Sequence, residues 1–310
     1  MRIEHTGKIT RDFYALGHPN VPVFLLDGPV PALFDAGFAC LASLYVKEIE
    51  KVLGPRSPGY LLLTHSHWDH VGAAGYFKDR WSGIRIAGHS RMRDVLSRPE
   101  VIRSIGDRNR EGARELQHWG IGEGYRTPFK SFDLDLSLEP GQVVPLPGHA
   151  GVHVIHTPGH TWEHMSYWIP DERVLVASEA VGCDHNGEIV TEFLVDYDAY
   201  RSSLKTLSQL DIEVLCLAHR VLFTGSDVKR FLERSLENAD AYVHMVEGIL
   251  AEMGGSLEET VARVKALQWD GLTFPKQPEP SYLLNTRARV GHVLERMNRK
   301  EGLSSPGKER

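Results

Sequence analysis

The sequence predicts an α/β fold with a helical extension, and three observations support this prediction. Short apolar runs alternate with amphipathic stretches across residues 21–89, in the order strand, loop, helix, strand. Further apolar runs return between residues 141 and 219, and only helical periodicity remains after Gly225. We therefore expect a catalytic domain over 1–225, a C-terminal helical module over 226–304 and a short tail over 305–310.

The first third of the chain carries the clearest strand signals. The segment "VPVFLLDGPVPALFDAG" contains two apolar runs separated by Asp27-Gly28-Pro29, which predicts a hairpin. An amphipathic helix follows, and Gly54-Pro55 ends it. Residues 60–64 and 83–89 are predicted strands, with a short helix over 72–81 between them.

Residues 91–117 interrupt this alternation of strands and helices, because they are charged and helical in pattern. Two interpretations stay open: a helical insertion that covers a site, or a solvated surface hairpin of helices. Strands then resume at 141–147 and 152–157, and a hairpin over 165–178 turns at Pro170-Asp171-Glu172.

A helix near 198–210 and a last strand at 213–219 complete the predicted domain. The helices expected beyond it cover 227–253, 257–267 and 282–297.

Composition excludes several classes of protein. The net charge of −6 argues against general nucleic-acid binding, although a local basic face is compatible with it. The three cysteines are far apart and include no CxxC pair, so they form neither a disulfide framework nor a thiolate zinc site. Without an apolar signal segment or a run near ~18 apolar residues, we expect a cytoplasmic protein with no membrane partner.

The segment "YLLLTHSHWDH" places His65, His67, Asp69 and His70 directly after an apolar strand. In an extended segment alternate side chains share a face, so His65 and His67 can converge on one point while Asp69 and His70 turn toward another. Imidazole nitrogens and carboxylate oxygens are good ligands for zinc, iron or manganese. The pattern therefore favours metal binding over a set of solvated loop histidines.

Candidate partners come from three later segments, since one cluster cannot complete two metal shells. His160 follows Pro158-Gly159 in a turn that would expose its ring. Glu179 follows the apolar run "VLVAS", and His219 ends "VLCLAH". Each candidate follows the carboxyl end of an apolar strand, where an α/β sheet presents a ligand site.

With these motifs in this order over roughly residues 20–225, the chain resembles the metallo-β-lactamase superfamily. The resemblance implies a four-layer αβ/βα sandwich with two divalent metal ions at one edge. Zinc is the first choice, and iron or manganese are alternatives. The implied ligands are His65, His67 and His160 for one metal, and Asp69, His70 and His219 for the other, with the Glu179 carboxylate between them.

Two positions depart from the usual pattern of that superfamily. Glu179 stands where Asp is usual, and its extra methylene shifts the carboxylate, so Asp184 and His185 are alternative participants. Ala218 and Arg220 flank the last histidine in place of the more usual glycines.

The implied reaction is hydrolysis of a small-molecule ester, thioester or lactone by a metal-bound hydroxide. Asp69 would orient the hydroxide and relay its proton. His164, four residues after His160, either supports a ligand or the substrate, or is an ordinary packed histidine. The alternatives are a metal-dependent nuclease or phosphodiesterase, and a di-iron regulatory protein with little hydrolytic activity.

The C-terminal helices resemble the helical, winged-helix-like extension found in several members of the superfamily, including endoribonucleases and hydroxyacylglutathione-hydrolase-like proteins. Their basic residues either contact phosphates or form the solvated face of an amphipathic helix, which we favour. These residues are Arg287, Arg289, Arg296, Arg299 and Lys300. Such helices often form dimer contacts, so a homodimer is one assembly to test.

Overall fold

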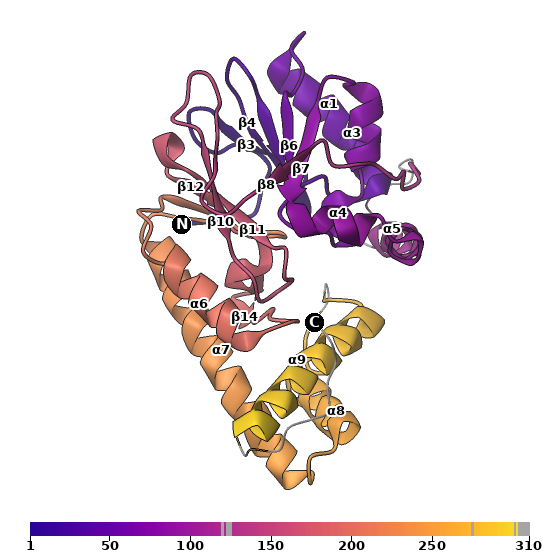
Figure 1. Ribbon diagram of the computed structural model, residues 1–310, viewed down its shortest axis with the longest axis vertical. Helices are drawn as coiled ribbons and strands as arrows, with labels where there is room; N and C mark the ends of the chain where they lie inside the picture. The colour runs from indigo at the N-terminus through magenta and orange to yellow at the C-terminus, as the bar shows by residue number, and fades with distance from the viewer. Residues whose placement is uncertain (119–120, 122–125, 274–275, 301, 303–310) are drawn as a thin grey trace.

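In a computed structural model the chain forms two facing β-sheets with helices on their outer sides (Figure 1). The structure describes residues 1–118, 121, 126–273, 276–300 and 302, so the predicted tail over 305–310 lies outside the described residues. Within the described residues, each main sheet has seven strands, and β13 (Cys183–His185) pairs separately with β14 (Glu188–Val190). This arrangement confirms the predicted α/β class and the four-layer αβ/βα sandwich.

The first sheet comes from the N-terminal half of the chain. Its order is β2 (Gly7–Lys8), β3 (Phe13–His18), β4 (Val21–Leu26), β5 (Ala32–Phe34), β6 (Tyr60–Leu62), β7 (Arg85–His89) and β8 (Leu136–Leu138). The predicted hairpin is β4 with β5, whereas β5 to β8 run parallel. The carboxyl ends of these parallel strands therefore lie at one edge of the sheet.

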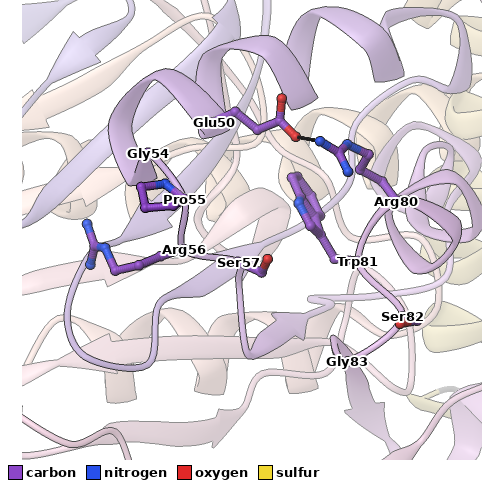
Figure 2. A pocket seen from close by; sticks show the side chains of 9 residues that line it. All are labelled: Glu50, Gly54, Pro55, Arg56, Ser57, Arg80, Trp81, Ser82 and Gly83. Atoms are coloured by element: carbon purple, nitrogen blue, oxygen red, sulfur yellow. Dashed lines mark ion pairs between the residues drawn. The ribbon is translucent and has the colours of Figure 1, made fainter.

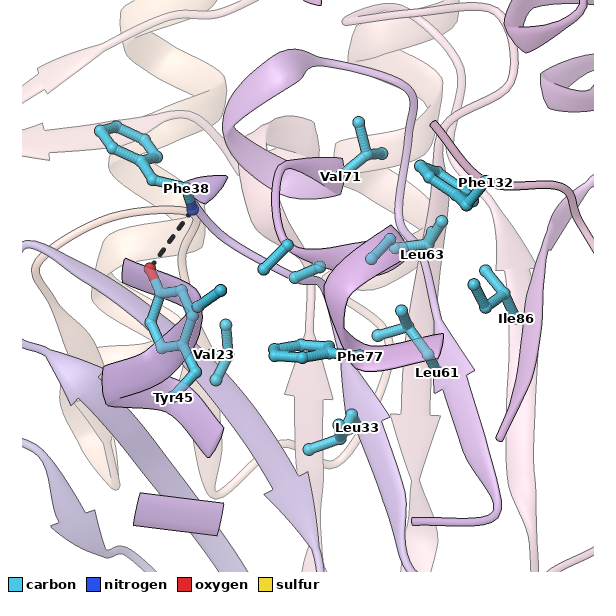
Figure 3. Close-up of a cluster of buried hydrophobic side chains, with 14 of the residues drawn as sticks. Val23, Leu33, Phe38, Tyr45, Leu61, Leu63, Val71, Phe77, Ile86 and Phe132 are labelled. Atoms are coloured by element: carbon cyan, nitrogen blue, oxygen red, sulfur yellow. Dashed lines mark hydrogen bonds between the residues drawn. The ribbon is translucent and has the colours of Figure 1, made fainter. Parts of the chain in front are cut away.

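The outer face of this sheet is covered by α1 (Ala42–Leu53) and α3 (Ala74–Arg80). Leu33 and Leu61 of the strands pack in one apolar cluster with Tyr45 of α1 and Phe77 of α3 (Figure 3). The Tyr45 hydroxyl is buried but satisfied, because it donates to the Val21 carbonyl at 2.9 Å. This cluster anchors the layer that carries the histidine motif.

The second sheet comes from the remainder of the chain. Its order is β1 (Arg2–Ile3), β16 (Leu222–Thr224), β15 (Val214–Cys216), β12 (Val174–Val176), β11 (Met165–Ile169), β10 (Val152–His156) and β9 (Val143–Val144). The expectation that 213–219 is the last strand is wrong. Arg220, with φ of 63°, reverses the chain, and β16 pairs antiparallel with β15. Three residues are too short to show strand periodicity in the sequence.

Helices α6 (Tyr197–Leu207) and α7 (Ser226–Glu252) cover the outer face of the second sheet. The remaining helices, α8 (Leu257–Gln268) and α9 (Glu279–Lys300), pack against α7. Although α7 begins at the predicted boundary, its Val228 and Phe231 join the same apolar cluster as Leu215 of the sheet. Among the described residues, no helix is long and apolar enough to cross a membrane.

Candidate metal centre

The histidine motif follows the carboxyl end of β6, and two of its imidazoles meet a third one from a distant turn. His65 is fully buried, and its ring centroid lies 4.5 Å from that of His67. His160 comes from the turn after β10, and its Nε2 lies 3.0 Å from Nδ1 of His67. One nitrogen from each of His65, His67 and His160 lies within 4.8 Å of the others, so these three residues could hold a metal ion.

A second group combines the end of the motif with two distant segments. Candidate ligand atoms of Asp69, His70, Glu179 and His219 all lie within 4.8 Å of one another. Nε2 of His219 is 3.3 Å from Oδ2 of Asp69. Asp69 and His70 face this group because α2 (Trp68–Val71) begins after His67, so the expectation of an extended segment there is wrong. The helical turn directs both side chains into this second group, although the His70 ring stays beside that of His65, with 4.3 Å between the ring centroids.

Glu179 lies between the two groups. Its Oε1 is 3.0 Å from Nε2 of His70 and 3.7 Å from Nε2 of His219, while its Oε2 is 3.8 Å from Nε2 of His65. Ser178 donates to Oε2 at 2.6 Å and holds the carboxylate in place. The longer Glu side chain therefore reaches both groups at the position where the superfamily pattern has Asp.

Hydrogen bonds to the outer nitrogens leave the inner nitrogens of these rings free to act as ligands. Nδ1 of His160 donates to the Glu192 carbonyl at 2.6 Å, and Nδ1 of His65 pairs with Thr64 Oγ1 at 3.0 Å. Among the described residues, no hydrogen-bond partner is found for the buried Nε2 of His65. A nitrogen without a partner that faces a carboxylate and other imidazole nitrogens is an arrangement that a divalent cation satisfies.

Asp35 supports both groups and was missed by the sequence analysis. Its carboxylate accepts from the Thr64 amide at 2.8 Å, from Thr64 Oγ1 at 2.9 Å and from Nδ1 of His70 at 2.8 Å. Asp35 directly follows β5, whose parallel neighbour β6 leads into the histidine motif. Asp35, at the start of "DAG", is a polar residue directly after an apolar strand, which is the same sequence signal that identified Glu179 and His219.

We expect Asp35→Asn to destabilise the protein by about 1–3 kcal/mol and to weaken metal binding. The amide has one acceptor oxygen, so it cannot accept all the hydrogen bonds that the carboxylate accepts. Asn also tolerates the positive φ of 56° at this position, which keeps backbone strain out of the comparison. Urea unfolding and zinc content would be measured, with the exposed Asp133→Asn as control. Unchanged stability and zinc content would show that Asp35 is dispensable.

Burial sets the charge state of the clustered histidines. It lowers the pKa of four of them, and that of His160 falls to about 4; the other three are His65, His67 and His164. Burial also lowers the pKa of His70, but Glu179 and Asp35 outweigh it and raise the pKa well above the usual value. The imidazoles of the first group are therefore neutral at neutral pH, so each ring has one nitrogen without a proton.

The metal-free protein should lose stability as the pH falls from about 6.5 toward 4. Over this window the unfolded chain takes up protons that the four buried histidines do not. His70 has the opposite sign, because its raised pKa stabilises the fold below about pH 6.5 and this effect is lost at higher pH. The four histidines with lowered pKa values outweigh His70, so the melting temperature of the metal-free protein should decrease as the pH falls over this window. In His160→Gln this decrease should be shallower. A flat profile would contradict these charge states.

Three other candidate residues take separate places. His164 is fully buried; its Nδ1 pairs with Thr157 Oγ1 at 2.9 Å and its ring stacks on His65 at 5.0 Å. Its buried Nε2 has no hydrogen-bond partner among the described residues, and a ring nitrogen of His164 lies within 4.8 Å of candidate ligand atoms of His65 and Glu179, so His164 either supports the His65 ring or is itself a candidate ligand. Asp184 does not join the centre, because it pairs with Arg2 at 2.7 Å, and His185 lies beside it in the separate β13–β14 hairpin. Of the two acids Glu179 and Asp184, it is therefore Glu179 that joins the centre.

The predicted insertion contacts the motif directly. It contains α4 (Ser90–Leu96) and α5 (Pro99–His118). Buried Asn109 of α5 accepts from the Ala39 amide at 2.9 Å and donates to the Trp68 carbonyl at 3.0 Å. Gly112 faces the Trp68 ring so closely that a Cβ there would lie 2.5 Å from it. This face of α5 therefore holds α2 in place and is not solvated.

A pocket elsewhere on the first layer is unrelated to these clusters. Its lining includes Arg56 after α1 and the Glu50–Arg80 ion pair beside Trp81 (Figure 2). These segments precede β6 and β7, whereas the histidine motif follows the carboxyl end of β6. The pocket therefore lies at the opposite edge of the sheet, and its lining includes no candidate metal ligand.

Comparison with known proteins agrees with the fold and with the resemblance seen in the sequence. A family model described as "Metallo-beta-lactamase superfamily" matches residues 22–219. The "Metallo-beta-lactamase fold-containing protein ST1585" of Sulfurisphaera tokodaii is 24% identical over 63% of this chain and 73% of its own. A hydroxyacylglutathione hydrolase of Rhodopseudomonas palustris is 29% identical over 58% of this chain, which spans 54% of that relative.

A solved structure has a similar fold over nearly the whole chain. The metallo-beta-lactamase family protein TTHA1429 from Thermus thermophilus has a TM-score of 0.63 and 21% identity, and the match covers 96% of each chain. At this identity the likeness concerns the fold.

Proposed function

Because this chain belongs to the metallo-beta-lactamase superfamily, we propose that it is a metal-dependent hydrolase of a small ester, thioester or lactone. The observation that carries the proposal is the position of Glu179, whose two oxygens face two separate groups of candidate ligands. A lone cluster of solvated histidines would have no such shared buried acid.

Two divalent ions, with zinc as first choice, would be held by the two groups. The residues proposed for one ion are His65, His67 and His160, and those for the other are Asp69, His70 and His219, with Glu179 between them. Bound divalent ions supply Lewis-acid chemistry, which lowers the pKa of water and polarises a carbonyl oxygen. The buried ligands are all histidine and carboxylate, which suits zinc, iron or manganese.

Asp69 is the residue proposed to handle the proton. Burial alone would raise its pKa, but the hydrogen bond from His219 lowers it to about 2, so the carboxylate is ionised at neutral pH. The side chains of Asp69 and His219 are 17% and 29% exposed, whereas that of His65 is inaccessible. The centre therefore opens on the Asp69 side, where the carboxylate can orient a water and pass its proton to the leaving group.

A thioester is favoured among the substrates because one of the relatives is named a hydroxyacylglutathione hydrolase. The nuclease alternative has less support, since several basic residues of α9 pair with acids. Arg287 pairs with Glu258, and Arg296 and Lys300 both pair with Glu247. Little unpaired positive charge is left along that helix to attract a phosphate backbone.

Metal analysis and a substrate panel test the proposal. Purified protein should contain about two divalent ions per chain and hydrolyse a thioester or lactone faster than a phosphodiester. A chelator should abolish turnover, and added zinc should restore it. Iron with reversible redox and no hydrolysis of any substrate would instead support the di-iron alternative, and preferential cleavage of RNA would support the nuclease.

A further inference from the structure

Arg289 of α9 is among the largest fully buried side chains, with 1% of its surface exposed. Being buried, Arg289 neither forms part of a solvated helix face nor can reach a phosphate. Both predictions made from the sequence for the basic residues of α9 are therefore wrong for Arg289. Its Nη1 donates to the Thr191 carbonyl at 2.6 Å and its Nη2 to Thr286 Oγ1 at 3.0 Å, while Tyr242 and Tyr282 flank it. Burying a guanidinium costs free energy, so these contacts are needed to offset that cost.

Arg289 holds the segment of backbone that positions His160. The Glu192 carbonyl, one residue after the Arg289 contact, accepts from Nδ1 of His160 at 2.6 Å. The amides of Leu194 and Val195 donate to the Gly159 carbonyl at 2.9 and 3.0 Å. Residues 191–195 therefore fix both the orientation of the His160 ring and the turn that carries it.

We propose that Arg289 is a positioning residue for the metal centre, through which the C-terminal helix α9 fixes the Thr191–Glu192 backbone and hence the His160 ring. This inference rests on the proposed role of His160 as a metal ligand. A hydrogen bond from the outer nitrogen of a ligand histidine sets its tautomer and ring angle, and losing such support weakens metal affinity. Because Arg289 anchors the neighbouring peptide, its loss should free the Glu192 carbonyl to move.

The test compares Arg289→Met with Arg287→Met in the full-length chain. Arg287 lies on the same helix, but its side chain is 55% exposed and pairs with Glu258 at the surface. Zinc alone would be titrated into metal-free protein against a chelating dye. We expect Arg289→Met to weaken, by about tenfold, the zinc site that His160→Gln abolishes, and to leave the other zinc site unchanged. Arg287→Met should match the wild type within about twofold.

A second readout reports on His160 itself and needs neither metal nor substrate. The strongly hydrogen-bonded Nδ1 proton of His160 should give a downfield proton resonance, assigned by its loss in His160→Gln. We expect this resonance to shift or broaden in Arg289→Met and to stay in place in Arg287→Met. If Arg289→Met does not fold, Arg289→Lys takes its place, since it keeps the charge but loses the two-pronged hydrogen bonding.

Unchanged zinc affinity together with an unchanged His160 resonance in a folded variant would overturn the inference. Equal weakening of both zinc sites would overturn it too, because that result marks general destabilisation. Failure of the proposed function has a different signature: the zinc-loaded wild type would hydrolyse none of the substrates. If the wild type binds no zinc, the His160 resonance still decides the role of Arg289.

Discussion

His67→Ala should lower kcat/KM by at least about 10³-fold and reduce the zinc content by about one ion per chain. His67 and His160 place two nitrogens 3.0 Å apart, whereas the additional histidine nearby, His164, is grouped with His65 and Glu179 and not with His160. Removing the ring leaves the first ion with two histidines, which is too few for a tight site. Zinc content by atomic emission and thioester hydrolysis would be measured together.

His244→Ala is the matched control for this variant. His244 lies on α7, and 80% of its side chain is exposed. Its ion-pair partner within the described residues is Glu247 of the same helix, at 3.5 Å. It should keep full zinc content and activity. Full activity in His67→Ala would show that the first group is not the catalytic metal site, whatever its geometry.

Glu179→Gln should reduce kcat/KM by about 10²-fold and weaken zinc binding at both groups. The amide keeps the size of the side chain but removes the negative charge shared by His65, His70 and His219. One amide oxygen can face only one group, whereas the two carboxylate oxygens face both. Zinc titration and steady-state kinetics would follow both effects, with the exposed Glu188→Gln of β14 as control.

The same variant makes a prediction for the metal-free protein. Glu179 is the main group that raises the pKa of His70 against the effect of burial, so this pKa should fall in Glu179→Gln. Imidazole resonances followed through a pH titration would report the change. Wild-type zinc affinity together with an unchanged His70 titration would show that Glu179 does not connect the two groups.

Much of the candidate centre could be predicted because its residues have local signals. The histidine motif, Glu179 and His219 each follow an apolar run, and strand ends of the two facing sheets bring these residues together. The structure groups them in the two predicted sets. Their side-chain chemistry and their place at strand ends were enough to nominate them.

The supporting contacts could not be predicted in the same way. The Glu192 carbonyl that orients His160 has no side-chain signature, because every residue carries the same group. Asp35 depends on the pairing of β5 with β6, which a single sequence does not state.

The sequence by itself determined the α/β class and the ligand-type residues, since these follow from strand periodicity and side-chain chemistry, whereas the division of these residues into two sets was implied by the resemblance to the superfamily. Only the tertiary structure decided that Glu179 reaches both sets and that Arg289 is buried against the segment behind His160. Helical periodicity describes which residues share a face, but not what that face meets. From the sequence, Arg289 of α9 is expected to be solvated. The structure shows its guanidinium bonded to the distant Thr191 carbonyl, because burial depends on neighbours that folding brings together.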